Sequence, residues 1–122
     1  MEELIYNIIA TDEVKKRVGD NIQPIVASAN TNGAYIVYSV TGEEDETTKD
    51  GITTTIVDAE VNVVTDSVQQ AIAIKIELEK AIKKARKWQD LSVRAKRTGI
   101  AETYSDDKFV VSISFAVRIV GR

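Results

Sequence analysis

The sequence predicts an α+β fold: a mostly antiparallel sheet of about four strands, arranged as two hairpins, with a long central helix and a short N-terminal helical segment packed on one face. Helical spacing of apolar residues marks the N-terminus and the middle of the chain, and β-branched or alternating segments mark four strands. No internal repeat or linker interrupts residues 1–122, so we expect a single domain.

The N-terminal segment predicts one broken helix or two short helices. A candidate N-cap, Thr11-Asp12, divides its apolar stripe, and Gly19 ends it. The apolar residues at helical spacing are Leu4, Ile5, Ile8, Ile9, Val14 and Val18. Residues 22–26 follow and contain the only proline, Pro24, so they can form at most an edge strand or an extended connector.

Two strands are predicted on either side of an acidic segment. Ala34–Val40 follows a turn at residues 30–33 and is rich in β-branched and aromatic residues. The second strand begins near Ile52 and alternates strictly between apolar and polar residues from Val57 to Val63. Between them, Glu43–Asp50 has five acids, one lysine and no apolar residue. We expect this segment to be a solvated loop that joins the two strands.

A long central helix is predicted from about Ser67 to Trp88. Asp66 and Gln69 have the spacing of a capping box. The residues that recur at steps of three and four are Ala71, Ile74, Leu78, Ala81, Ala85 and Trp88. Ile72, Ile76 and Ile82 widen this apolar surface, which predicts contact with a further layer or with another subunit.

The last two strands form the second predicted hairpin. Apolar and polar residues alternate from Leu91 to Lys96, and Gly99 is a candidate bulge. Asp106-Asp107 predicts the turn. From Phe109 to Ile119 the alternation continues without a break and gives the clearest strand pattern of the chain.

The composition excludes several classes of function. The chain has neither cysteine nor histidine, so thiolate nucleophiles, disulfides and histidine general bases are absent. No glycine-rich phosphate loop occurs, and we expect no enzyme, no cofactor and no metal site. The net charge of -3 argues against bulk nucleic-acid binding. The acidic start and the lack of a long uncharged apolar run predict an intracellular or particle-bound protein without a membrane segment.

Two charged regions are candidate contact surfaces. The acidic region consists of Glu43, Glu44, Asp45, Glu46 and Asp50; it could ligate a hard cation, but a solvated hairpin tip is the simpler interpretation. Between Lys75 and Arg97, nine basic residues stand against three acids. These bases could be a solvated helix face that favours the helix dipole, a phosphate-binding surface, or a patch that docks on an acidic surface such as a neighbouring copy.

Several sequence segments resemble those of the phage tail-completion proteins of long-tailed bacteriophages. These proteins are also called head-tail joining or tail-terminator proteins. These segments are Asp12-Glu13-Val14 through Ile22 with Pro24 after it, Ala34–Tyr38, Val57–Val63 with the polar loop before it, and Asp66-Ser67 before a long helix. The resemblance covers nearly the whole chain. That family often has a proline just before the strand at Tyr35, where this chain has Gly33-Ala34. The resemblance implies an α+β ring subunit that closes the tail tube and faces the head connector, without catalysis or a cofactor.

The sequence and the resemblance together predict a structural virion protein, located at the head-tail junction and assembled in the host bacterial cytoplasm. It would form a homo-oligomeric ring, a hexamer or a dodecamer, whose partners are the tail-tube and head-connector proteins. DNA would pass nearby without specific binding, repelled by an acidic lumen. The candidate interface residues are Glu43, Glu44, Asp45, Glu46, Asp50, Ile72, Ile76, Ile82, Lys83, Lys84, Arg86 and Lys87. The alternatives are a small intracellular, dimeric protein-binding module, and a weak nucleic-acid binder that uses Lys75 to Arg97.

Overall fold

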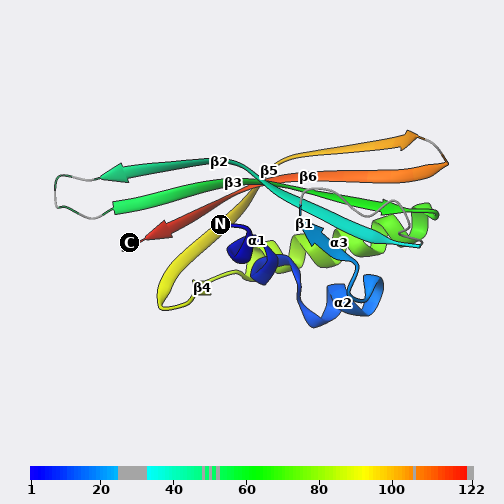
Figure 1. Ribbon diagram of the computed structural model, residues 1–122, viewed down its shortest axis with the longest axis horizontal. Coiled ribbons are helices and arrows are strands. Elements are labelled where there is room, and N and C mark those ends of the chain that lie inside the picture. The colour runs from blue at the N-terminus through cyan, green and yellow to red at the C-terminus, as the bar shows by residue number, and fades with distance from the viewer. Residues whose placement is uncertain (25–32, 48, 50, 52, 106, 121–122) are drawn as a thin grey trace.

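A six-stranded sheet dominates the computed structural model, which describes residues 1–24, 33–47, 49, 51, 53–105 and 107–120 (Figure 1). Its strands are β1 (Ile22–Pro24), β2 (Tyr35–Thr47), β3 (Thr53–Thr65), β4 (Lys87–Trp88), β5 (Leu91–Ser105) and β6 (Lys108–Val120). They lie in the order β1-β2-β3-β6-β5-β4. β1 runs parallel to β2, and every other neighbouring pair is antiparallel, so the sheet is mixed.

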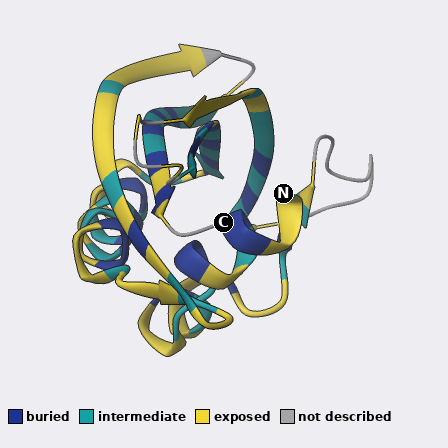
Figure 2. Cartoon of the chain, turned by 90° about the vertical axis from the view of Figure 1, so that its left-hand side faces the viewer, coloured by how far each residue is buried: buried dark blue, intermediate teal, exposed yellow. Residues whose placement is uncertain are grey.

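The predicted fold, a four-stranded antiparallel sheet with a long central helix, is wrong. Of the described residues 54% lie in strands, and the six strands curl into an open half-barrel with three short helices (Figure 2). Strand β4 has only two residues, too few to show an alternating pattern in the sequence. Strand β1 has three residues at the edge of the sheet, which is the edge-strand alternative predicted for the segment that begins at Ile22. The other four strands have 13 to 15 residues each, because their hydrogen-bonded ladders continue beyond the apolar segments.

The helices are α1 (Glu2–Ile9), α2 (Asp12–Val18) and α3 (Val68–Lys84). The prediction of two short N-terminal helices is confirmed, and Thr11 caps α2 by accepting a hydrogen bond from the Val14 amide at 3.3 Å. At α3 the N-cap is Ser67, whose hydroxyl accepts from the Gln70 amide at 3.4 Å, so the predicted capping pair is displaced by one residue.

The central helix is shorter than predicted. It ends at Lys84, because Ala85 leaves the helical region with φ -62 and ψ 123. The chain then turns back, and Lys87 and Trp88 pair with Ser92 and Leu91 as strand β4. Trp88 therefore packs against the core from a strand and not from the helix predicted to reach it.

The core lies between one face of the sheet and the three helices, which Figure 1 shows on a single side of it. The alternation predicted in β3 is confirmed, since Val57, Ala59, Val61 and Val63 are buried. In β6 the odd-numbered residues from 111 to 119 are buried in the same way. The helices contribute the other half of the core: Leu4, Ile5, Ile9, Val14, Ala71, Ile74 and Leu78. Burial of these apolar side chains provides most of the stabilising free energy.

The turns are confirmed only where the structure describes them. The register between β5 and β6 shifts between Arg97 and Gly99, as expected for a bulge at Gly99. Asp107 has the positive φ of 62 that a tight turn requires, whereas Asp106 lies outside the described residues. The predictions for residues 25, 26, 30–32 and 52 also lie outside them.

Candidate interaction surfaces

The acidic segment is a strand and not the solvated loop that we predicted. Residues Glu43–Glu46 belong to β2 and pair with Val57–Thr54 of β3. All four acidic side chains are exposed, and Asp45 accepts a hydrogen bond from the Thr55 hydroxyl at 2.7 Å. Asp50, the fifth acid of the predicted cluster, lies outside the described residues.

A charged strand forms here because β3 provides its partners. The ladder from Glu43 to Thr47 satisfies backbone groups on the side that faces β3, after a register shift between Val40 and Gly42. The other side of β2 is an edge, since β1 pairs only with Ile36–Tyr38. Charged side chains are common on such edges, because they keep the unpaired backbone hydrated.

The three isoleucines predicted to lie at an interface separate in the structure. Ile72 and Ile76 are 48% and 45% exposed, together with Val68, one turn earlier on the same face of α3. Ile82 is only 2% exposed and belongs to the core, so its assignment to an exposed contact face is wrong. Beside Val68 and Ile72, a hollow of about 270 Å³ reaches Tyr104 of β5, which is 60% exposed.

The predicted basic cluster gathers where α3 ends. Lys83, Lys84, Arg86 and Lys87 are all exposed there. The guanidinium of Arg86 donates to the carbonyl oxygens of Lys83 at 2.6 Å and Ala85 at 2.8 Å. Arg86 thereby satisfies helix-terminal carbonyls, and the two lysines of the last turn favour the negative end of the helix dipole. These residues therefore stabilise the helix end while remaining exposed to a partner.

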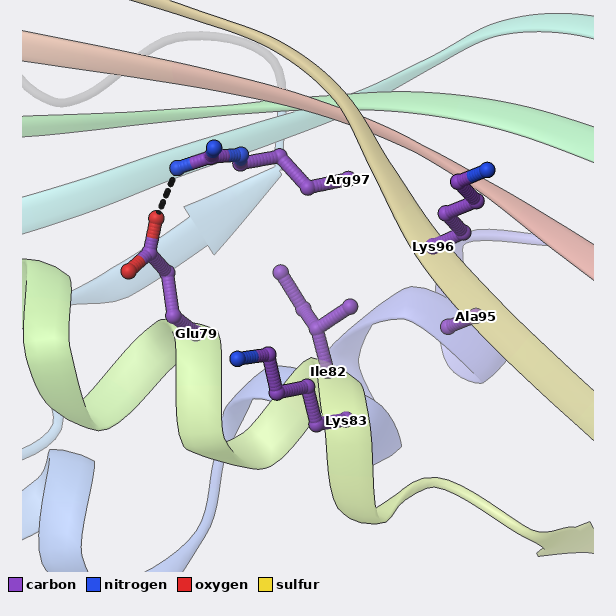
Figure 3. A pocket seen from close by; sticks show the side chains of 6 residues that line it. All are labelled: Glu79, Ile82, Lys83, Ala95, Lys96 and Arg97. Carbon is purple, nitrogen blue, oxygen red and sulfur yellow. Dashed lines mark hydrogen bonds and ion pairs between the residues drawn. The ribbon is translucent and has the colours of Figure 1, made fainter.

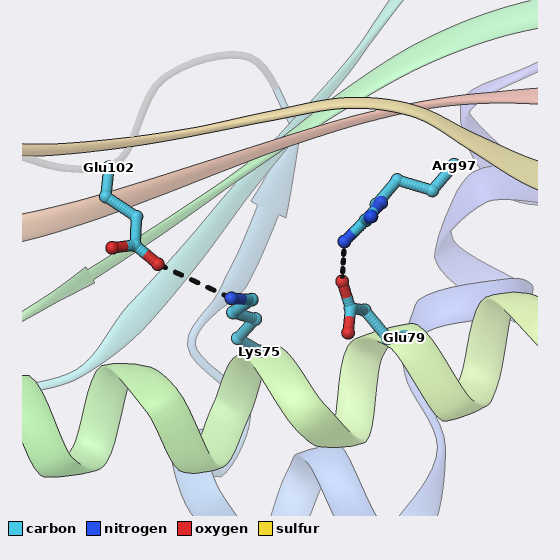
Figure 4. A network of polar contacts seen from close by, with 4 residues as sticks. All are labelled: Lys75, Glu79, Arg97 and Glu102. Atoms are coloured by element: carbon cyan, nitrogen blue, oxygen red, sulfur yellow. Dashed lines mark hydrogen bonds and ion pairs between the residues drawn. The ribbon is translucent and has the colours of Figure 1, made fainter.

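Three of the other basic residues between Lys75 and Arg97 are paired with acids. Lys75 contacts Glu102 at 3.4 Å, Arg97 contacts Glu79, and Lys80 contacts Glu77 at 3.7 Å. Figure 4 shows the first two pairs bridging α3 and β5. These pairs reduce the positive potential that a phosphate backbone would meet.

A groove of about 330 Å³ lies between α3 and β5 (Figure 3). Its lining includes Glu79 and Arg97, which pair with each other, and the apolar side chains of Ile82 and Ala95. Lys83 and Lys96 are the cationic groups of the lining for which no ion pair is found within the described part of the chain. The groove offers the amines of these two lysines beside apolar side chains and the ion-paired carboxylate of Glu79.

One face of the sheet is divided into an acidic half and a basic half, which the sequence alone did not indicate. Opposite the helices, β2 and β3 carry Glu44, Glu46 and Asp58, while β5 and β6 carry Arg94, Lys96 and Arg118. The register places Glu44, Ile56, Arg118 and Arg94 in one row across four strands. Only the strand order reveals this division, because the acidic and basic segments lie far apart in the sequence.

The described residues contain neither a metal-binding cluster nor a membrane-spanning helix. No group of three or more acidic side chains there has a geometry that would hold a metal ion. None of the helices in that part is both long and apolar enough to cross a membrane.

Comparison with known proteins gives a structural likeness. No protein-family model matches the sequence, and no curated protein matches it significantly. A chain in the solved virion of a native gene transfer agent particle has a TM-score of 0.73 and 17% identity, over 97% of this chain and 92% of that chain. A second solved chain has a TM-score of 0.58 and 19% identity, over 98% of this chain and 95% of that one. At these identities the likeness establishes the fold.

Proposed function

We propose that this protein is a structural subunit of a phage-like virion and forms a ring at the head-tail junction. The supporting observation is its likeness in fold, over nearly the full length of both chains, to a component of a gene transfer agent virion. The resemblance to tail-completion proteins provides the finer position, at which the ring closes the tail tube and meets the head connector. The proposed role involves neither catalysis nor a cofactor.

The surfaces of the chain suit a ring subunit. A closed ring of identical copies requires two different and complementary patches on each copy. The acidic end of β2 and the basic residues of α3 and β5 are of opposite charge and lie on separate elements. The exposed side chains of Ile72 and Ile76 add an apolar surface that a neighbouring subunit or a virion partner would bury.

The alternative of a nucleic-acid binder is less well supported. Its basic patch includes Lys75, Lys80 and Arg97, each of which is paired with a glutamate. A strongly salt-dependent affinity for DNA would favour that alternative over the ring. We expect instead that DNA passes the subunit without specific binding.

Deletion of the gene tests the proposed position. In the phage or element that encodes the chain, we expect the deletion to produce filled heads and unjoined tails, visible in negative stain. A plasmid copy should restore joined particles, and mass spectrometry of purified particles should detect the chain. Joined particles of normal tail length without the protein would contradict the junction role. Absence of the chain from complemented particles would contradict any virion role.

The mass of the purified protein tests the ring itself. Light scattering across protein concentration and salt, with negative-stain images of any large species, should show a closed ring. Because the candidate contacts are charged and exposed, the ring should loosen as salt screens them. A tight dimer at every concentration would instead support the protein-binding module.

A further inference from the structure

Both edges of the sheet are largely uncovered. β1 pairs with β2 only at Ile36–Tyr38, and β4 pairs with β5 only at Leu91 and Ser92. Within the described residues, and leaving Glu43 aside, no backbone hydrogen bond to another element is found for the outer edge of β2 from Ser39 to Thr47. The same holds for β5 after Val93, whose amide donates to the Arg86 carbonyl at 2.9 Å. Unpaired strand edges of this kind can accept a further strand.

The two edges carry opposite charge at the same end of the sheet. Acidic Glu44 and Glu46 lie near the end of β2, and basic Arg94 and Lys96 lie near the start of β5. Figure 1 shows both segments on the left of the molecule. All four side chains are exposed, and none of them belongs to an ion pair within the described part of the chain.

These charges select one way in which two copies can meet. Two β2 edges would bring acids against acids, and two β5 edges would bring bases against bases, which repel each other. Only the β2 edge of one copy and the β5 edge of the next are complementary. Such a contact is heterologous, and repeated rotation of it builds a ring.

The strand directions also favour this contact. Within the sheet β5 runs antiparallel to β2, because β2, β3, β6 and β5 are successively antiparallel. Rotation about an axis along the strands preserves these directions, so β5 of one copy meets β2 of the next in antiparallel orientation. In that orientation β4 and the neighbour's β1 lie at opposite ends of the new pairing. In a parallel pairing, they would lie at the same end and obstruct each other.

We infer that a second copy of this chain occupies each free edge: the segment of β2 around Glu44 and Glu46 pairs with the segment of β5 around Arg94 and Lys96 of its neighbour. The sheet then continues from subunit to subunit. Backbone hydrogen bonds provide the affinity, and the charges determine which edges can pair. This inference rests on the proposed ring and names its contact.

Two charge-reversal variants test the contact. In variant R94E/K96E both edges are acidic, and in variant E44K/E46K both edges are basic. Each variant alone should self-associate at least 10-fold more weakly than the parent protein in light scattering. An equimolar mixture should recover the assembly, because each acidic edge then meets a basic one. Far-UV circular dichroism should show that both variants remain folded, since the four side chains are exposed.

Two variants on inner strands serve as controls. Asp58 and Arg118 are exposed on the same sheet face, but they belong to β3 and β6, which have neighbours on both sides. D58K and R118E should therefore assemble like the parent protein. Cysteine substitution at Glu44 and at Arg94 in separate chains should allow a short bismaleimide to link mixed copies, with little linking in either chain alone. The parent chain has no cysteine that would interfere.

The outcomes distinguish the contact from the proposed function. Folded edge variants that assemble like the parent protein, a mixture that does not recover, or equal linking in single and mixed cysteine samples would each overturn the edge contact. A parent protein that stays monomeric in solution, together with cysteine variants at Glu44 and Arg94 that give no link in purified particles, would overturn it as well. The virion role is judged separately, by whether particles contain the chain and whether its deletion leaves heads and tails unjoined.

Discussion

Replacing Ile82 with alanine tests the division of the α3 isoleucines into core and surface. The Ile82 side chain is 2% exposed and belongs to the core cluster under β5. The substitution removes three buried carbons, worth about 2.4 kcal/mol at about 0.8 kcal/mol each. The cavity left behind raises the expected loss to about 3 kcal/mol of unfolding free energy. For a chain of this length, such a loss lowers the melting temperature by about 12 °C.

The matched control is Ile72→Ala on the same helix. Its side chain is 48% exposed, so the substitution removes less buried surface, and alanine favours the helix slightly more than isoleucine. We expect a loss below about 1 kcal/mol for this variant. Both proteins should remain helical, which far-UV circular dichroism will show.

The assay is urea denaturation followed by circular dichroism and by the fluorescence of Trp88, the single tryptophan. Protein concentration must be equal in all samples, because subunit association adds concentration-dependent stability. If the two variants have unfolding free energies within about 0.5 kcal/mol of each other, Ile82 is not a core residue and the packing of α3 against β5 is refuted.

Three further substitutions test the sheet, a helix cap and a buried phenol. Ile113→Asp should abolish folding, measured by circular dichroism, because Ile113 is 0% exposed and an unpaired buried charge costs several kcal/mol; a stable soluble variant would refute the core face of β6. Ser67→Ala should cost about 1 kcal/mol in urea denaturation by removing the cap of α3, and an unchanged midpoint would show that the cap is not needed. Burial, aided by the negative charges of Tyr6 and Glu2, raises the pKa of Tyr38 above 10.0. Its neutral form therefore supports folding fully below about pH 10, and this support is lost as the pH rises through the raised pKa; Tyr38→Phe should remove that alkaline loss in a denaturation series, and an identical loss in both proteins would contradict it.

The sequence predicts strands correctly where burial of one face makes apolar and polar residues alternate. Alternation from Val57 to Val63 and from Val111 to Ile119 is confirmed, because one face of each strand is buried under helices. Strand β4 does not show in the sequence, because a pairing of two residues leaves no periodic pattern, whereas β1 confirms the edge-strand alternative predicted for the segment that begins at Ile22. The loop that the sequence predicts at Glu43–Glu46 is wrong, because their strand conformation comes from the ladder with β3 and not from their own propensity.

The candidate contact residues were only partly predictable, and helix geometry explains one error. Ile72 and Ile76 are about 40° apart around a helix, whereas Ile76 and Ile82 are about 120° apart. Ile82 instead continues the stripe of Ile74 and Leu78, and the structure buries all three. The basic edge at Arg94 and Lys96 could not be recognised, because an edge is a property of strand order and the sequence does not display strand order.

The sequence predicts that the acids of β2 line a DNA conduit and repel DNA, whereas the edge contact assigns a different physical role to Glu44 and Glu46. The two roles predict opposite behaviour of the E44K/E46K variant. As lumen residues, the reversed charges would leave ring assembly intact and slow DNA passage through attraction to phosphates. As edge residues, they would abolish self-association, and only a copy with acidic residues on β5 would restore it. Assembly of this variant alone, compared with its mixture with R94E/K96E, therefore decides which surface of the subunit the acids serve.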